Sequence, residues 1–378
     1  LVAIPTDLGT NPIGRALVWV GDRSYSWYLW HWPALVLAAL FGGSVANVLV
    51  AIGVSLGLAH LSFHLIESRT SSRRIGRKAS VGWLVGLGVL GPAVLGYGLT
   101  TAADRWRPVL EPKDWQRGTL GGKHGCHRSE PWDAAACTWA VPDARGSVLL
   151  LGDSHAASAS DAVIEAGNDL GYDVSVAYKA GCPATDRTPV DSPGCAAWQA
   201  FAIDLVGRLH PDYVVISNRS MKYTLTPGNE PGIDRAVPSA TGVVPTTEAE
   251  AVQNWADGLD AFAAAVGGRT KVVLIGPTPD YPVDPVPLVR WLGGDPAPGR
   301  VSRLEAERVR QPVMTAEQTV VAAHPGWTYL DPLPLVCPDP TCSQVTDGHW
   351  LYRDDNHLTR VGSLRMLDAL EQVLGGRP

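Results

Sequence analysis

The stretch SVLLLGDSH, residues 147–155, decides the fold of this chain. Its apolar beginning predicts a buried strand, and Gly152 marks a sharp turn at the end of that strand. The residues that follow, Ala156 to Leu170, have the pattern of a helix. We therefore expect Ser154 to lie in a strand-to-helix turn, at the carboxyl end of its strand.

Short apolar runs and longer helical patterns alternate through the rest of the chain. Further strands are expected at Asp173 to Ala177, Tyr213 to Ser217, Lys271 to Ile275 and Trp327 to Leu330, and further helices at Ala196 to Leu209, Ala249 to Val266, Arg300 to Ala323 and Thr359 to Leu374. This alternation predicts an α/β domain with a parallel sheet covered by helices on both faces, and an active site at the carboxyl ends of the strands. The Gly- and Pro-rich stretches 224–247 and 277–299 are expected to be loops over the site or on its rim.

A second polar motif, DDNH at residues 354–357, precedes the last predicted helix. A serine hydroxyl is a poor nucleophile at neutral pH, so it needs an imidazole to take its proton and a carboxylate to orient that imidazole. Ser154, His357 and Asp354 have the residue types for such a triad. The sequence therefore predicts a serine nucleophile with a split triad.

Both motifs also have a structural interpretation. Serine favours helix N-caps, so Ser154 could cap its own helix, and Asp354 could cap the final one. Asp153 is expected to be structural, and His155 to be a solvent-facing helix residue. The triad and the caps remain alternatives at this point.

The first hundred or so residues are almost entirely apolar, unlike the rest of the chain. Three segments there are candidates to cross a bilayer, which takes about 20 apolar residues: Tyr25 to Leu40, Val45 to Leu65 and Val81 to Leu99. The basic cluster at 69–78 assigns the loop between the last two segments to the cytoplasm. Everything after about residue 100 should then lie outside the cytoplasm.

The length and the net charge of the chain limit its possible domain organisation and partners. The 378 residues leave room for a membrane portion and one full-sized globular domain. With 31 basic and 37 acidic residues the chain has a net charge of −6. Because no long basic stretch occurs outside one loop, the charge argues against a nucleic-acid partner.

All six cysteines follow the predicted spans and fall in close pairs. In an oxidising compartment the simplest pairing joins nearest neighbours. A zinc site is the competing interpretation, but the chain lacks a CxxC pair and a nearby Cys/His tetrad, so we expect no metal. The three expected disulfides are Cys126 with Cys137, Cys182 with Cys195, and Cys337 with Cys342.

Taken together, the motifs resemble an SGNH (GDSL-type) esterase or acyltransferase domain. The resemblance rests on the Gly-Asp-Ser-His turn at 152–155, the Gly-Cys-Pro loop at 181–183 and the Asp354-x-x-His357 motif. Upstream, SYSWYLWHWP at 24–33 and LIE at 65–67 resemble the last helices of the acyltransferase-3 family of membrane proteins. The resemblance covers nearly the whole chain and implies the C-terminal fragment of such a protein with its fused SGNH domain.

The resemblance also implies a role for each site residue. Ser154 would attack an acyl carbonyl, with His357 as its base and Asp354 orienting the imidazole. The oxyanion would be bound by the backbone N–H groups of Ser154 and Gly181 and by the amide of Asn218. The usual Gly-x-Asn-Asp setting is absent around Asn218, and the neighbouring Arg219 is an alternative donor.

Three parts of the chain follow from this resemblance. Residues 1–100 would be the C-terminal transmembrane helices of an acyltransferase-3 domain plus a linking helix, 101–146 a linker and SGNH extension, and 147–378 an extracytoplasmic SGNH domain with a three-layer fold. The chain is expected to be a truncated piece of a multi-pass protein of the cell membrane. Its partners would be the lipid bilayer, the missing N-terminal acyltransferase-3 helices and a cell-envelope glycan.

The implied activity is O-acyl transfer, with acetyl as the expected group, through an acyl-serine to a glycan hydroxyl. No cofactor is expected in the SGNH domain, and acyl-CoA would be the donor to the membrane part. Two alternatives stay open. One is an extracellular carbohydrate esterase, or deacetylase, in which water replaces the sugar hydroxyl, and the other is a non-catalytic glycan-binding domain.

Overall fold

The structure, a computed structural model, describes residues 12–40, 45–64, 97, 101, 113–116, 118–127, 132–224, 236–268, 270–282 and 299–376. The chain forms two compact units. One comprises residues 1–110 and 286–296, and the other residues 111–285 and 297–378.

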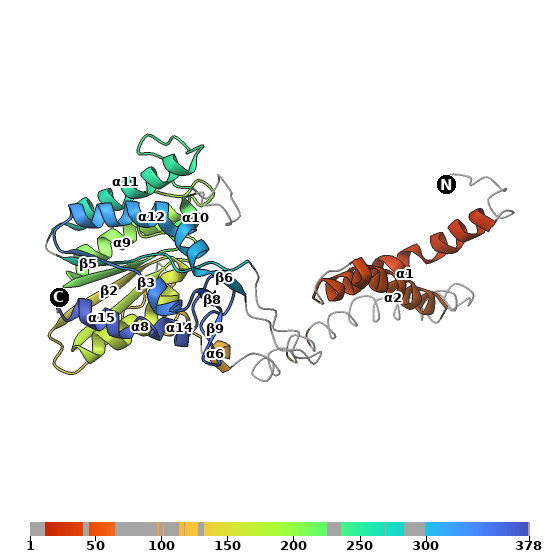
Figure 1. The fold of residues 1–378 in the computed structure, drawn as a ribbon, viewed down its shortest axis with the longest axis horizontal. Helices are drawn as coiled ribbons and strands as arrows, with labels where there is room; N and C mark the ends of the chain where they lie inside the picture. Colours follow the sequence, from red (N-terminus) through yellow and green to blue (C-terminus); the bar gives the residue numbers. More distant parts are fainter. Residues whose placement is uncertain are drawn as a thin grey trace, which may run out of the picture. The chain divides into compact units, whose positions relative to one another are not determined.

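A six-stranded sheet runs through the middle of the larger unit (Figure 1). Its strands are β1 (Thr138–Trp139), β2 (Gly146–Gly152), β3 (Tyr172–Tyr178), β4 (Tyr213–Ser217), β5 (Lys271–Ile275) and β7 (Trp327–Leu330). They lie in the order β1-β3-β2-β4-β5-β7. The last five are parallel, while β1 pairs antiparallel with β3 at the edge. The sheet is therefore mixed, not parallel throughout as predicted, because a two-residue edge strand leaves no pattern in the sequence.

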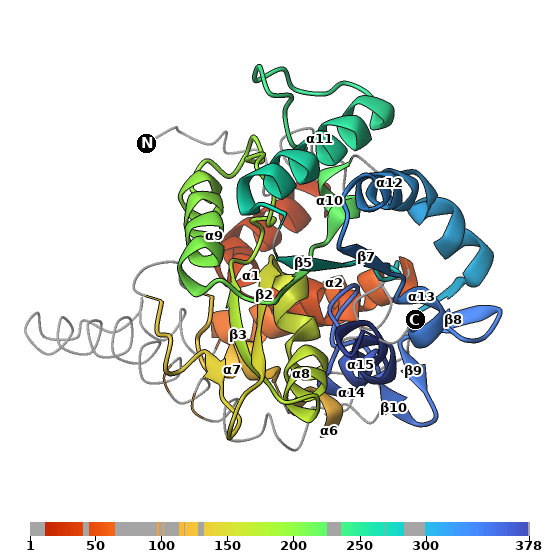
Figure 2. The ribbon, with the colours of Figure 1, turned by 90° about the vertical axis from the view of Figure 1, so that its left-hand side faces the viewer.

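Helices cover both faces of this sheet (Figures 1 and 2). One face carries α8 (Ser154–Asp169), α14 (Arg360–Leu364) and α15 (Leu367–Leu374), and the other α9 (Cys195–Leu209), α11 (Glu248–Val266) and α12 (Arg303–Ala323). Successive side chains of a strand point to opposite faces. Leu150 accordingly belongs to one buried cluster, and its neighbours Leu149 and Leu151 to the other. The apolar run of β2 is continuous because both of its faces are covered.

Several element boundaries differ from the prediction. Residues 300–302 form a strand, β6 (Arg300–Ser302), which pairs with β8 (Thr341–Ser343), so α12 begins only at Arg303. The single helix expected at the end of the chain is two helices, α14 and α15. The remaining short elements are α6 (Lys113–Gln116), α7 (Leu120–Lys123), α10 (Ser220–Tyr223), α13 (Leu333–Val336), β9 (Val345–Thr346) and β10 (His349–Trp350).

The described residues between 113 and 146 pack against the α/β domain. Trp115 Nε1 donates to the carbonyl of Tyr352 at 3.0 Å, and Trp132 Nε1 donates to that of Val176 at 3.1 Å. The N–H of Leu120 is bound by the carboxylate of Asp161 at 3.1 Å. These contacts make the segment part of the same compact unit.

Three disulfides join cysteines that are neighbours in sequence: Cys126–Cys137, Cys182–Cys195 and Cys337–Cys342. All six cysteines are buried. The described residues include no free cysteine.

The smaller unit contains a pair of helices, α1 (Pro12–Leu40) and α2 (Val45–Ser62). Trp27 Nε1 of α1 donates to Ser55 Oγ of α2 at 3.0 Å. Helix α1 begins well before Tyr25, where the first membrane span was predicted to start. Of the predicted third span, 81–99, all but Tyr97 lies outside the described residues.

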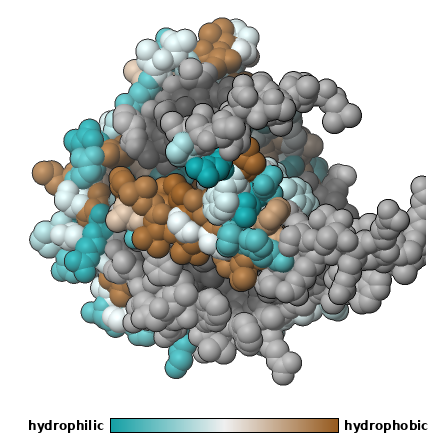
Figure 3. All heavy atoms as spheres, turned by 90° about the vertical axis from the view of Figure 1, so that its right-hand side faces the viewer, coloured by the Kyte–Doolittle hydropathy of each residue, from teal (hydrophilic) through white to brown (hydrophobic). Residues whose placement is uncertain are grey.

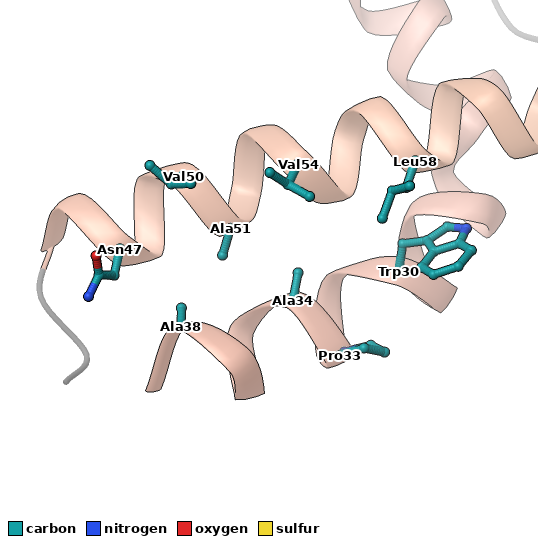
Figure 4. A pocket seen from close by; sticks show the side chains of 9 residues that line it. All are labelled: Trp30, Pro33, Ala34, Ala38, Asn47, Val50, Ala51, Val54 and Leu58. Carbon is teal, nitrogen blue, oxygen red and sulfur yellow. The ribbon is translucent and has the colours of Figure 1, made fainter. Parts of the chain in front are cut away.

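The surface of this helix pair is strongly apolar. Leu17, Tyr28, Trp32, Val45 and Leu49 are all exposed, and apolar side chains gather on the face drawn in Figure 3. A groove of about 270 Å³ between the helices is lined almost entirely by apolar side chains (Figure 4). By length and composition, α2 could cross a membrane, and no other helix in the described ranges passes that test.

Candidate active site

Ser154 lies at the first residue of α8, directly beyond the carboxyl end of β2. The strand ends at Gly152, where a Cβ atom would stand 1.9 Å from the carbonyl oxygen of Ser217 on the neighbouring β4. Only glycine permits this approach, which brings the serine to the end of two adjacent strands. Asp153, not Ser154, caps the helix, because its Oδ1 accepts the N–H of His155 at 2.8 Å. The hydroxyl of Ser154 is thus free of the capping role.

Asp153 also ties the serine turn to the segment after β4. Its Oδ2 accepts the backbone N–H of Arg219 at 3.0 Å and the hydroxyl of Tyr223 at 2.8 Å. Only 1% of Asp153 is exposed. Burial, followed by the nearby Asp153 carboxylate, raises the pKa of Tyr223, so its hydroxyl remains a donor. The structural role expected for Asp153 agrees with these contacts.

His357 lies between Ser154 and Asp354. Its Nε2 is 2.8 Å from Ser154 Oγ, and its Nδ1 is 2.8 Å from Asp354 Oδ2. Burial alone would raise the pKa of Asp354, but the hydrogen bonds and charge of His357 outweigh it and lower that pKa to about 2. The carboxylate is therefore ionised at neutral pH and can only accept, so Nδ1 carries the proton and Nε2 is free to accept from the serine.

The DDNH motif forms a tight turn before α14. Residues Tyr352 and Leu358 pair across its base, and the N–H of Arg353 donates to the carbonyl of His357 at 2.9 Å. Thr359, not Asp354, caps the helix, since its Oγ1 accepts the N–H of Gly362 at 3.1 Å. The capping alternative for Asp354 is therefore wrong.

The predicted oxyanion donors follow the ends of the strands on either side of β2. Gly181 comes after β3 with a φ of +75°, a left-handed conformation that favours glycine. Asn218 follows β4, and its Oδ1 accepts the N–H of Ala184 at 3.0 Å. Its Nδ2 is buried without a hydrogen-bond partner among the described residues. A buried amide donor left unpaired costs free energy unless a ligand uses it.

Arg219, the alternative donor, is held by carboxylates. Its Nη2 lies 3.0 Å from Asp280 Oδ2 and 3.8 Å from Asp355 Oδ2. Asp280 follows β5 and Asp355 belongs to the DDNH turn, so this arginine links the ends of three elements around the site. This position suits Arg219 to a scaffolding role better than to that of an oxyanion donor.

His155 is a site residue that the sequence analysis misplaced. It was expected to face solvent, but only 6% of it is exposed, and its ring lies against that of His357 with centroids 5.3 Å apart. Its Nε2 is 3.1 Å from Asn356 Oδ1. One feature of the sequence indicated that His155 lies at the site. It directly follows Ser154, in the first turn of a helix whose N-terminus lies at the site.

No three His, Cys, Asp or Glu side chains come together as a possible metal site within the ranges that the structure covers. The side chains of Ser154, His357 and Asp354 bring together a hydroxyl, an imidazole and a carboxylate. In this order and at these distances the three groups can make a serine nucleophilic and stabilise the imidazolium that forms.

Comparison with known proteins identifies a matching family model and several similar proteins. A stretch of 79 residues is 39% identical to the putative peptidoglycan O-acetyltransferase YrhL of Bacillus subtilis (strain 168) and covers 18% of this chain and 12% of that protein. The lipopolysaccharide acetyltransferase periplasmic domain of Salmonella ser. Paratyphi A is 15% identical, with 63% of this chain and 85% of that one covered and a TM-score of 0.42. The M. smegmatis aryl esterase is also 15% identical, with 61% and 99% covered and a TM-score of 0.37.

The family model described as the SGNH domain fused to AT3 domains matches residues 125–372, which include both motifs of the site. The match takes in more than half of the chain. This protein therefore belongs to the family of SGNH domains that are fused to AT3 domains.

Proposed function

We propose that this protein is an O-acyltransferase that carries an acyl group, acetyl in the first instance, on Ser154 and transfers it to a hydroxyl of a cell-envelope glycan. One observation carries the proposal. The hydroxyl of Ser154, the ring of His357 and the carboxylate of Asp354 are joined by two contacts of 2.8 Å each. Family membership and the O-acetyltransferase relative support the direction of the reaction.

In the first half-reaction Ser154 Oγ attacks the acyl carbonyl and forms a new C–O bond, while His357 Nε2 takes the hydroxyl proton. The imidazolium is stabilised by the ionised Asp354. Collapse of the tetrahedral intermediate breaks the bond to the leaving group, which departs with the proton from His357. The product of this step is an acyl-serine.

The tetrahedral intermediate places a negative charge on the former carbonyl oxygen. We assign its binding to the N–H of Ser154, the N–H of Gly181 and Nδ2 of Asn218. The N–H of Ser154 belongs to the first residue of α8, where a helix offers no acceptor of its own. Each such donor is typically worth about 3 to 4 kcal/mol in the transition state.

In the second half-reaction His357 removes a proton from the acceptor hydroxyl, whose oxygen attacks the acyl-serine and releases Ser154. A sugar hydroxyl gives acyl transfer, and water gives hydrolysis. The name of the Bacillus relative supports a glycan acceptor.

We further propose that residues 1–100 are the C-terminal helices of an AT3 domain in the cell membrane and that residues 147–378 lie outside the cytoplasm, joined by 101–146. The exposed apolar surface of α1 and α2 supports a membrane location for these helices. Acyl-CoA would be the donor to the membrane part.

The proposal is tested with the full chain solubilised in detergent. It is incubated with p-nitrophenyl acetate, with and without soluble peptidoglycan fragments, and Ser154→Ala serves as the matched control. Acetylated glycan formed by the wild type alone supports the acyltransferase. Release of acetate with no acetylated glycan would identify an esterase, and a wild type no faster than Ser154→Ala would identify a binding domain.

A further inference from the structure

His155 is a buried histidine that the proposed mechanism does not use. Its backbone N–H donates to Asp153, the N-cap of α8, its ring lies against the ring of His357, and its Nε2 meets Asn356 Oδ1 at 3.1 Å. Asn356 is itself 4% exposed. The second histidine thus joins the serine helix to the turn that carries the other two members of the triad.

The direction of this hydrogen bond follows from the partners of Asn356. Its Nδ2 donates to the carboxylate of Asp355, so the amide is oriented with Oδ1 toward His155. An amide oxygen only accepts, and Nε2 of His155 must therefore carry the proton. The backbone N–H of Asn356 in turn donates to Asp354 Oδ1 at 3.0 Å. Asn356 is held from both sides, by His155 and by the carboxylate that orients the base.

We propose that His155 is a positioning residue, whose Nε2–H holds Asn356 and through it fixes the Asp354–His357 turn against Ser154. The inference rests on the proposed serine chemistry and deepens it. Its physical reason is that a base must stay within hydrogen-bond reach of the proton it takes, and a misplacement of about 1 Å can cost about 100-fold in rate.

The surroundings of His155 keep its ring neutral. Burial lowers its pKa to about 4, the charge of Asp153 opposes this effect, and His357 and Arg219 act in the same direction as burial. A neutral ring can lie beside His357 without repelling the imidazolium that forms there during the reaction. An uncharged donor is therefore the suitable link at this position.

Two substitutions separate the hydrogen bond from the packing of the ring. His155→Phe keeps an aromatic ring against His357 but loses the donor. His155→Gln loses the ring but brings an amide N–H to about the place of Nε2. If the bond to Asn356 matters, we expect His155→Phe to lower kcat for p-nitrophenyl acetate about 10- to 100-fold with KM nearly unchanged, and His155→Gln to recover most of that loss.

A double-mutant cycle with Asn356→Ala tests whether His155 acts through this partner. We expect His155→Phe to cost less than about threefold in kcat when Asn356 is already alanine. Melting temperatures are measured for every variant, and kcat is compared only among variants that melt within a few degrees of the wild type. If His155→Phe fails to fold, the comparison of His155→Gln with the wild type and with His155→Gln/Asn356→Ala decides the matter in the same way.

The inference is overturned if His155→Gln is slower than His155→Phe, or if the losses at positions 155 and 356 multiply. Either result would mean that the ring of His155 contributes packing contacts but does not act through its hydrogen bond to Asn356. Failure of the proposed serine chemistry gives a different outcome, because Ser154→Ala would then be as active as the wild type whatever residue stands at position 155. An esterase in place of an acyltransferase would leave the comparison at position 155 unchanged and would show itself by the absence of acetylated glycan.

Discussion

Asp354 binds His357 at two points. Its Oδ2 meets the ring Nδ1 at 2.8 Å, and its Oδ1 accepts the backbone N–H of the same histidine at 2.6 Å. The two residues are three positions apart in the sequence. A single carboxylate therefore fixes both the backbone position and the ring tautomer of the candidate base. Asp355, the adjacent carboxylate, instead lies 3.8 Å from Arg219.

This asymmetry between two neighbouring aspartates predicts a sharp contrast in activity. Ser154→Ala and His357→Ala should each lower kcat by about 10⁴-fold or more, because the triad acts as a unit. Asp354→Ala should cost somewhat less, and Asp355→Ala less again, at most about 10-fold, since its ion pair with Arg219 is partly exposed and its bond to Asn356 bears on the triad only indirectly. Rates of p-nitrophenyl acetate hydrolysis and circular dichroism spectra check these values. A normal Asp354→Ala together with an inactive but folded Asp355→Ala would show that the triad uses the other aspartate.

The unpaired amide of Asn218 predicts a transition-state defect. Asn218→Ala should lower kcat about 10²- to 10³-fold with KM nearly unchanged, because one oxyanion donor is lost, and should also lower the melting temperature, because the N–H of Ala184 loses its acceptor. Asn254 provides the control, since it is a buried asparagine whose Nδ2 donates to the carbonyl of Val237. If Asn254→Ala reduces kcat as much as Asn218→Ala, Asn218 has no special role.

The disulfides are tested by mass spectrometry of a non-reduced digest. Peptides joined as Cys126–Cys137, Cys182–Cys195 and Cys337–Cys342 are expected. Removing the second of these with a double alanine substitution should cost about 2 to 4 kcal/mol of unfolding free energy and also lower kcat, because Cys182 directly follows Gly181. The double alanine variant at 337 and 342 should affect stability alone. Free thiols in the native protein would contradict the pairing.

Glu317 predicts a pH dependence of stability that is independent of the active site. It lies on α12, is 1% exposed, and accepts hydrogen bonds from Trp255 and Tyr329 at 3.1 Å each. Burial raises its pKa to about 7, against about 4 for an unfolded glutamate. The folded state therefore holds a proton that the unfolded state releases, and this stabilisation is complete below about pH 4 and is lost as the pH rises to about 7.

The measurement is the melting temperature between pH 4 and 8. The melting temperature of the wild type minus that of Glu317→Gln should fall as the pH rises from about 4 to about 7, and it should stay constant at higher pH. The wild type compared with Glu305→Gln, at a half-buried position of the same helix, should show no loss of stability across this window. A wild type that runs parallel to Glu317→Gln from pH 4 upward would mean that Glu317 is ionised throughout.

The membrane arrangement is tested by cysteine labelling in intact cells. Single cysteines introduced at Arg73 and at Ser239 should respond oppositely to a thiol reagent that cannot cross the membrane, because the basic loop is expected inside and the α/β domain outside. Labelling at 73 before the cells are opened, or none at 239 until they are, would refute this arrangement.

The core of the α/β domain could be predicted from the sequence because its strands are buried on both faces. All five predicted strands are present, and each overlaps its expected range. The short strands β1, β6, β8, β9 and β10 could not be predicted, since two or three residues show no periodicity. The start of α1 was missed for a different reason, because the helix continues through Gly21, Asp22 and Arg23, which interrupt the apolar run.

The site could be predicted only as far as its own motifs reached. Ser154, Asp354 and His357 stood in recognisable patterns, and the structure brings their side chains together. His155 gave no comparable signal, because its partner Asn356 is two hundred residues away and their contact exists only once the fold has formed. The pairing of Arg219 with Asp280 was hidden for the same reason.

The close approach of Ser217 to Gly152 has a consequence for how relatives of this protein are recognised. The glycine of the Gly-Asp-Ser signature is required by the spacing of two strands, and it would be required equally in a descendant that had lost its nucleophile. Retention of this glycine in a sequence therefore reports an intact scaffold and says nothing about turnover. We expect an inactive homologue to carry substitutions at the positions of Ser154 and His357 and to keep the glycine at the position of Gly152.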